Sequence, residues 1–194
     1  MFSLLQRRFF FRHLMAGGFA CLLGAQTVKA VSLPELENDP KMTPKRFANQ
    51  FEGFEYEFFS YVQRPEVFLS SRRGDCDDYA LLADRILSRR NFTTRIVRVV
   101  LAGRRVNHVV CYVAESKAYL DYNSRNYFLN LDRSGPTLRE IAEKVAASFE
   151  ANWSSASEFT YDYATDKKTI VYTVVKTEPP SRDPDRQPRA GGRN

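Results

Sequence analysis

Two periodicities of apolar residues divide this chain, and they limit its fold more than any other feature. Between Thr43 and Pro65, apolar side chains recur at steps of three and four residues. This spacing predicts one amphipathic helix that begins at Pro44 and ends before Pro65. From Thr94 onward, short segments rich in Val, Ile, Thr and Tyr have the character of strands. The stripe of the predicted helix consists of Phe47, Phe51, Phe54, Phe58 and Val62.

Two more helices are predicted from their end signals. Three acids in residues 75–78 favour the positive end of a helix, which then continues to a stop at residues 89–91. Thr137 and Glu140 form a capping box that opens a helix with Leu138, Ile141, Val145 and Phe149 on one face.

Five strands complete the predicted core, as antiparallel neighbours joined by short connections. Their ranges are Thr94–Leu101, Val106–Val113, Ala118–Tyr122, Phe159–Tyr163 and Ile170–Val175. The last two close a hairpin around residues 165–168. The order helix, helix, strands, helix, strands predicts an α+β fold.

The first 30 residues have the pattern of an export signal. A basic start with Arg7, Arg8 and Arg12 precedes an uncharged stretch, and small residues stand at the positions that a signal peptidase recognises before a cut after Ala30. A membrane-spanning helix is the alternative, but it needs about 20 apolar residues, and Gly and Gln interrupt this run. We expect a cleaved signal peptide and an exported protein, periplasmic or secreted. The paired arginines are similar to a twin-arginine motif.

Charge and composition set the remaining boundaries. The formal charge of +6 includes four basic residues in the first 30, where there is no acid, so the rest of the chain is close to neutral. No nucleic-acid surface is therefore expected, since such surfaces need basic residues on a folded face. Residues 178–194 are rich in Pro, Gly and charge, which predicts a disordered tail. We expect residues 31–177 to form one domain, with no stable membrane insertion after removal of the signal.

The chemistry of this domain centres on Cys76. After signal removal the chain keeps two cysteines, Cys76 and Cys111, and one histidine, His108. Cys76 stands at the predicted start of a helix, where backbone N–H groups favour a thiolate, and an imidazolium nearby lowers the pKa of a thiol further. A nucleophile of this kind needs a base, and the base needs a group that orients it.

His108 and Asp121 lie on successive predicted strands and meet these needs. Side by side, the Asp121 carboxylate would bind one ring nitrogen of His108 and leave the other for Cys76. Each residue also has a plain structural alternative: a packed thiol, a satisfied core histidine or a strand-end cap. The presence of all three in this chain order favours a Cys-His-Asp triad.

The segments RRGDCDDYALLADRIL, NHVVCYV and AYLDYN carry a resemblance to a known group. They resemble the transglutaminase-like superfamily, a papain-like branch of cysteine enzymes, and in particular its small exported bacterial cysteine peptidases. The resemblance covers residues 65–123. It implies a papain-like core, with Cys76 as nucleophile, His108 as general base and Asp121 as orienting carboxylate.

The implied reaction is attack on a peptide or isopeptide amide, release of an amine, and resolution of a thioester by water or another amine. A hydrolase acting on a protein or peptide is expected; a protein-crosslinking transglutaminase and a binding or assembly module on the same fold are the alternatives. The backbone N–H of Cys76 is the natural first donor of an oxyanion hole. Gln63 and Asn107 are candidates for the second, since the single tryptophan, Trp153, lies after the triad, unlike that of eukaryotic transglutaminases.

No cofactor is required by this chemistry. Asp75, Asp77 and Asp78 are a possible part of a calcium shell, as in some exported relatives, but capping of the helix by the same acids is favoured. One histidine and two dispersed cysteines do not give the spacing of a zinc site. Cys111 alternates with His108 along its strand, so if His108 faces Cys76, Cys111 faces away and is a buried packing thiol.

Overall fold

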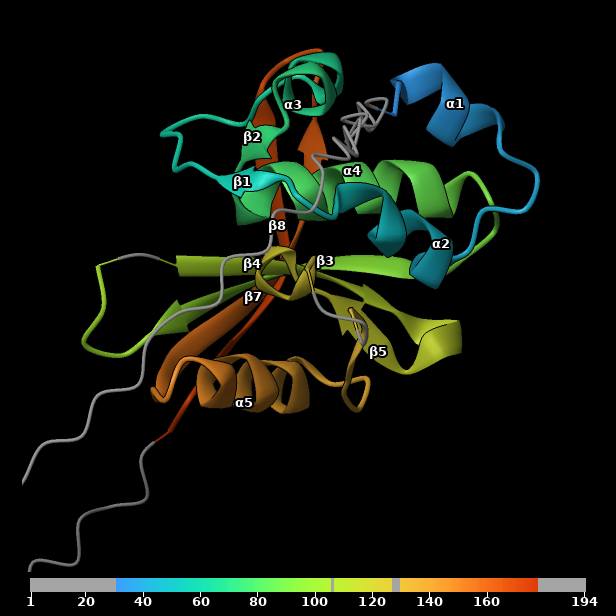
Figure 1. The fold of residues 1–194 in the computed structure, drawn as a ribbon. Helices are drawn as coiled ribbons and strands as arrows, with labels where there is room; N and C mark the ends of the chain where they lie inside the picture. Colours follow the sequence, from blue (N-terminus) through green and yellow to red (C-terminus); the bar gives the residue numbers. More distant parts are fainter. Residues whose placement is uncertain (1–30, 106, 127–129, 178–194) are drawn as a thin grey trace, which may run out of the picture.

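A computed structural model describes residues 31–105, 107–126 and 130–177. The predicted signal peptide (residues 1–30) and the predicted tail (residues 178–194) lie outside these residues. The described chain is a sheet with helices on both sides, α4 (Cys76–Ser88) on one and α5 (Leu138–Ser148) on the other (Figure 1). Helices and an antiparallel sheet confirm the α+β class. Among the described helices, none has the length and apolar character needed to cross a membrane.

The large sheet has six strands in the order β6-β5-β4-β3-β7-β8, with antiparallel neighbours throughout. All five predicted strands are present, and β3 has the predicted bounds. The second predicted strand begins at residue 106, which lies outside the described residues. Strand β5 ends at Leu120, before the predicted end at Tyr122. Strands β7 and β8 begin earlier than predicted. The bounds are β3 (Thr94–Leu101), β4 (Asn107–Val113), β5 (Ala118–Leu120), β6 (Asp132–Arg133), β7 (Trp153–Asp162) and β8 (Lys167–Val175).

Alternation along the strands divides the core into two layers. Val97, Val99, Val110 and Tyr112 pack with α5, while the residues between them face the side of α4. Helix α5 begins at the predicted capping box, with Glu140 accepting from the N–H of Thr137. Helix α4 is buried along most of its length because Tyr79, Ala80, Leu82, Ala83, Ile86 and Leu87 are covered by the sheet and by the N-terminal segment.

The long helix predicted between Pro44 and Pro65 is wrong. The segment forms α2 (Pro44–Ala48) and the 3-10 turn η1 (Asn49–Phe51), and then turns at Gly53, whose φ of 75° suits glycine. Strand β1 (Glu55–Tyr56) follows and pairs in parallel with β2 (Arg73–Gly74).

The spacing of the phenylalanines reflects burial rather than a continuous helix. Phe47, Phe51 and Phe54 are buried; the first two pack on Tyr79, with the rings of Phe51 and Tyr79 4.9 Å apart, and Phe54 packs on Phe51. Phe58, the next member of the stripe, is 64% exposed.

Outside residues 44–64, and besides β2, two short helices and three 3-10 or strand segments were not predicted. Helix α1 (Leu33–Asn38) begins with a capping box between Ser32 and Glu35, a signal present in the sequence. Helix α3 (Pro65–Ser71) begins at Pro65, which suits the first turn of a helix as well as the end of another. The other segments are η2 (Ala114–Ser116), η3 (Tyr122–Ser124) and β6.

Candidate active site

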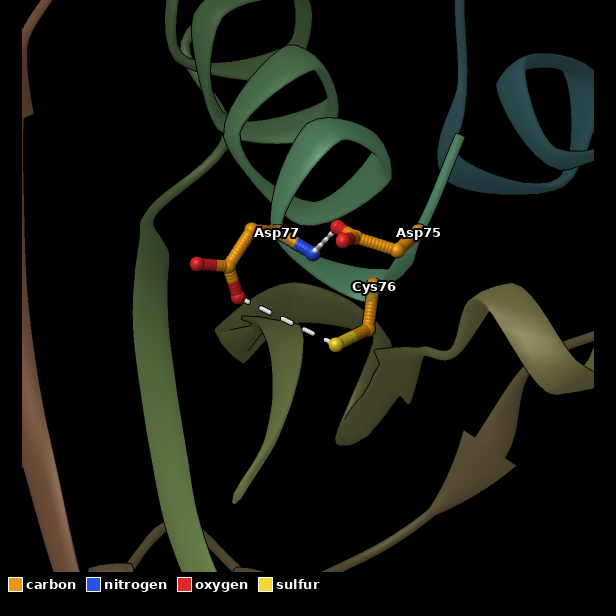
Figure 2. A group of neighbouring side chains, drawn as sticks. All are labelled: Asp75, Cys76 and Asp77. Carbon is orange, nitrogen blue, oxygen red and sulfur yellow. Dashed lines mark hydrogen bonds between the residues drawn. The ribbon is translucent and has the colours of Figure 1, made fainter. Parts of the chain in front are cut away.

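Cys76 is the first residue of α4, as predicted, and its side chain leaves the helix toward the sheet (Figure 2). It is 8% exposed. Its Sγ lies 3.8 Å from Oδ1 of Asp77, a weak hydrogen bond of the thiol. Neither Cys76 nor Cys111 forms a disulfide.

The thiol lines a cleft of about 420 Å³. One wall is the aromatic loop that follows β1, and the opposite wall is formed by β3, β4 and the β7–β8 hairpin. The lining residues that the argument uses are Tyr56, Phe58, Tyr61, Arg98, Arg105, Asn107, Val109 and Lys168. Cys76 therefore lies between the two walls, where a peptide bound in the cleft would contact both of them.

A network of hydrogen bonds holds the start of α4 in place. Asp75 caps the helix: its carboxylate accepts from the N–H groups of Asp77 at 3.0 Å and Phe59 at 3.1 Å. The carboxylate of Asp78 accepts from the backbone N–H and from Nε2 of Gln63, at 2.7 and 2.8 Å. Asp75 and Asp78 thus connect the start of α4 to the loop after β1, which forms the aromatic wall of the cleft.

His108 and Asp121 form a buried pair, as predicted. Nε2 of His108 lies 2.9 Å from Oδ1 of Asp121, which also accepts from the N–H of Asn123. Within the described part of the chain, no hydrogen bond is made to the other ring nitrogen, Nδ1. The pair therefore has the form of a base oriented by a carboxylate.

The structure does not join this pair to the thiol by a hydrogen bond. The His108 ring lies 4.8 Å from the ring of Phe149, which follows α5. The neighbours of His108 on β4, Asn107 and Val109, line the cleft with Cys76, whereas His108 does not. Two of the three predicted residues are thus paired, and the complete triad stays a prediction.

The argument that placed Cys111 needs correction. Cys111 is a buried, free thiol, as predicted. It belongs, however, to the same apolar cluster as Cys76 and α4, together with Val109. The prediction assumed that the α4 side of β4 carries His108. Strict alternation gives that side to Asn107, Val109 and Cys111 instead.

The electrostatics also differ from the expected thiolate. Burial raises the pKa of Cys76 well above its ordinary value, and the negative charges of Asp77, Asp75 and Asp121 raise it further. The backbone N–H of Val109 lowers it, but less than burial raises it. The acids that suit the helix end therefore disfavour an anionic sulfur beside them.

The structure distinguishes between the two candidates for the second donor of the oxyanion hole. Nε2 of Gln63 already donates to Asp78 and to the carbonyl of Arg73, so Gln63 is wrong as a candidate. Trp153 lies in the layer of α5 and does not line the cleft. Asn107 is exposed in the cleft with Cys76, which leaves it as the side-chain candidate of the two.

The acids fit a helix cap better than a calcium shell. One carboxylate oxygen of Asp75, one of Asp77 and the Sγ of Cys76 lie within 4.8 Å of one another, near enough to be considered as metal ligands. Both oxygens of Asp75 and both of Asp78 already accept backbone or amide N–H groups. Asp77 then remains, and one carboxylate falls far short of the six to eight oxygens of a calcium shell.

Several residues of the cleft were not predicted. Arg98 interrupts the apolar strand TRIVRVVL, and this interruption was the available signal. Lys168, on β8, lies 3.6 Å from Oδ2 of Asp77 and over the ring of Phe159. Tyr56, Phe58 and Tyr61 lie within the range of the helix predicted from Pro44, yet they are exposed at the cleft.

Two comparisons with known proteins found chains or families similar to this one. A family model described as a transglutaminase-like domain matches residues 34–134, just over half of the chain. Among solved structures, calcium-bound LapG of Legionella pneumophila is similar at 18% identity, with a TM-score of 0.41, over 62% of this chain and 67% of that one. No curated protein matches the chain. The matched span contains α4 and strands β3 to β6, and the chain belongs to the family of transglutaminase-like domains.

Proposed function

We propose that this protein is an exported thiol-dependent hydrolase that acts on peptide or isopeptide amides. The observation that carries the proposal is the position of Cys76, at the start of a buried helix and in the wall of a cleft, next to the strand that holds the His108–Asp121 pair. Family membership supports the same chemistry.

The reaction assigned to these residues has two steps. In the first, the Cys76 sulfur bonds to the amide carbonyl carbon while its proton passes to His108; the C–N bond then breaks, and the amine leaves with that proton. In the second, water activated by His108 cleaves the thioester and releases the acid. Asp121 orients the imidazole and takes no proton.

This mechanism requires that Sγ and the free Nδ1 come within hydrogen-bond reach. In the unliganded protein Sγ contacts Asp77, and the thiol is neutral because of burial. Catalytic hydrogen bonds are often long in unliganded enzymes and form with substrate bound. Because His108 packs against Phe149 on the α5 side of β4, we propose that substrate in the cleft displaces the Sγ–Asp77 contact and that the His108 imidazole turns toward the thiol.

The test combines labelling with turnover. Cys76→Ala should abolish turnover of the native substrate protein and labelling at this position, whereas Cys111→Ala should affect neither. His108→Ala should abolish turnover while the protein keeps its thermal unfolding midpoint within a few degrees. An added primary amine distinguishes hydrolysis from transamidation, since only the latter incorporates the amine into product. Full turnover by the His108→Ala protein would refute the proposal.

A binding or assembly module is the second candidate. The raised pKa of Cys76 and the lack of an Sγ–imidazole hydrogen bond both favour it. Such a module would bind its partner equally well as wild type and as Cys76→Ala, and would release no new amino terminus from it. Mass spectrometry of the partner before and after incubation separates the two functions.

Export remains part of the proposal. It rests on the basic start, the uncharged stretch and the small residues before Val31. It places the substrate among periplasmic or cell-surface proteins.

A further inference from the structure

Two arginines form a cationic wall in the cleft beside Cys76. Arg98 lies in the middle of β3 and stands opposite Val109 of β4 in the strand register. Val109 in turn lies beside the thiol, because its backbone N–H is among the groups that influence the sulfur. Arg105 belongs to the turn between β3 and β4 and lines the same cleft. We call Arg98 and Arg105 the arginine pair.

The arginine pair has no anionic partner within the described residues. Nε of Arg98 is buried and has no hydrogen-bond partner. No ion pair or aromatic contact joins either guanidinium to another described residue, whereas Arg95 of the same strand is paired with Glu158 at 2.7 Å. Arg98 is partly buried and Arg105 is exposed; a buried donor such as Nε of Arg98 is usually matched by a hydrogen-bond partner.

The acids of the cleft are engaged elsewhere. Asp75 accepts from Asp77 and Phe59, and Asp77 faces Lys168. Asp166, at the tip of the β7–β8 hairpin, accepts from the hydroxyl of Tyr161. None of them neutralises the arginine pair, so this wall keeps a positive charge that faces the cleft.

We propose that the arginine pair binds a carboxylate of the substrate, from an Asp or Glu side chain close to the amide that Cys76 attacks. Guanidinium groups suit this role because their N–H donors match the two oxygens of a carboxylate. The assignment rests on the proposed function, which it deepens by naming an acidic peptide as the substrate class. The exposed aromatic residues of the other wall then contact apolar parts of the same peptide.

The first experiment compares two reagents that differ only in charge. N-iodoacetylglycine and N-iodoacetylglycinamide alkylate Cys76, and their rate ratio is measured against the same ratio for unfolded protein in urea. Relative to unfolded protein, we expect the folded protein to react about three- to tenfold faster with the acid reagent than with the amide reagent. An effect of this size is expected from a partly buried ion pair. The preference should decrease with salt. Arg98→Gln and Arg105→Gln should each reduce it, and the double variant should abolish it.

Arg133→Gln is the matched control, because it removes the same charge from an exposed residue of β6 outside the cleft. It should leave the preference unchanged. An acid preference that survives in the double variant, or that is lost equally in Arg133→Gln, overturns the proposal.

The second experiment does not depend on the reactivity of the thiol. Cys76→Ala protein is titrated with N-acetylglutamate α-amide and with N-acetylglutamine α-amide, and the Nε–H resonance of Arg98 is followed by ¹H–¹⁵N NMR. A shift with the acid alone supports the carboxylate site, and no shift with either overturns it. If Arg98 responds to the carboxylate but the wild-type protein shows no turnover, the proposed enzymatic function is refuted and the carboxylate site is retained. If the wild-type protein shows turnover but Arg98 does not respond to the carboxylate, the carboxylate site is refuted and the enzymatic function is retained.

Discussion

Nε2 of His108 and Oδ1 of Asp121 are 2.9 Å apart, in a buried contact that links the start of β4 to the residue after β5. The carboxylate also receives the N–H of Asn123 and so caps η3. Asp121 therefore has a structural role that an asparagine can keep, and in the proposed mechanism it has an orienting role that only a carboxylate performs. This difference allows the two roles to be measured separately.

Asp121→Asn should lower turnover much more than stability. Because the amide oxygen still caps η3, the free energy of unfolding should fall by only about 1 kcal/mol. Turnover should fall by about 10²- to 10⁴-fold, since the imidazole loses its preferred tautomer. Urea denaturation and initial rates measure the two quantities. Asp132→Asn, which alters a partly buried acid bonded to Ser124, is the control and should keep turnover. Equal turnover in both variants would remove Asp121 from the mechanism.

Asp77→Asn should make Cys76 more reactive. The Asp77 charge is the largest influence after burial that raises the pKa of the thiol. Its removal lowers that pKa, so the thiolate fraction at pH 8 and the rate of iodoacetamide labelling should rise by about three- to tenfold. The pH–rate profile of labelling, followed by mass spectrometry, should shift toward lower pH. A slower reaction, or an unshifted profile, would show that Asp77 does not act on the sulfur through its charge.

Asp75→Asn should change how stability depends on pH. Burial, opposed by the Phe59 N–H and reinforced by Asp78, raises the pKa of Asp75 from 3.8 to about 6. The folded state therefore holds this proton more tightly than the unfolded state, so the wild type loses stability as pH rises from about 4 to 6. The asparagine variant lacks this loss. The difference in unfolding free energy, variant minus wild type, should increase across that interval and level off above it. A difference that is flat from pH 4 to 7 would contradict the raised pKa.

Gly74→Ala should destabilise the start of α4. A Cβ at this position would lie 2.5 Å from Cδ2 of Phe68 and 2.8 Å from Oδ2 of Asp78. We expect a loss of about 1–3 kcal/mol in unfolding free energy from this overpacking. The second substitution Phe68→Leu should recover part of it by making room for the methyl group. If Gly74→Ala unfolds at the same urea concentration as wild type, the close packing of Gly74 is refuted.

The signal sequence predicts the start of the mature protein. The predicted cleavage after Ala30 would leave Val31 as the first residue. Amino-terminal sequencing of protein from the native host tests this directly. Ala30→Leu, which places a large side chain at the cleavage position, should cause accumulation of the longer precursor. A host protein that keeps Met1 would refute both the cleavage and the export route.

Local signals in the sequence determined the helices and strands that carry the site. The acids around Cys76 cap α4, the Thr137–Glu140 pair opens α5, and the apolar run of residues 94–101 forms β3 at its predicted bounds. Each of these signals acts within one turn or one strand, so no distant contact is needed to recognise it. The α+β class follows from their order.

Tertiary contacts decided the remainder. Spacing alone predicted one helix from Phe47 to Val62, but burial around Tyr79 and the turn at Gly53 set the path of that segment and left Phe58 exposed at the cleft. Likewise, the sequence named Cys76, His108 and Asp121, but only the packing of β4 between two helical layers shows which face each side chain takes. Side chains alternate along a strand, and which face receives α4 depends on contacts between residues far apart in the chain.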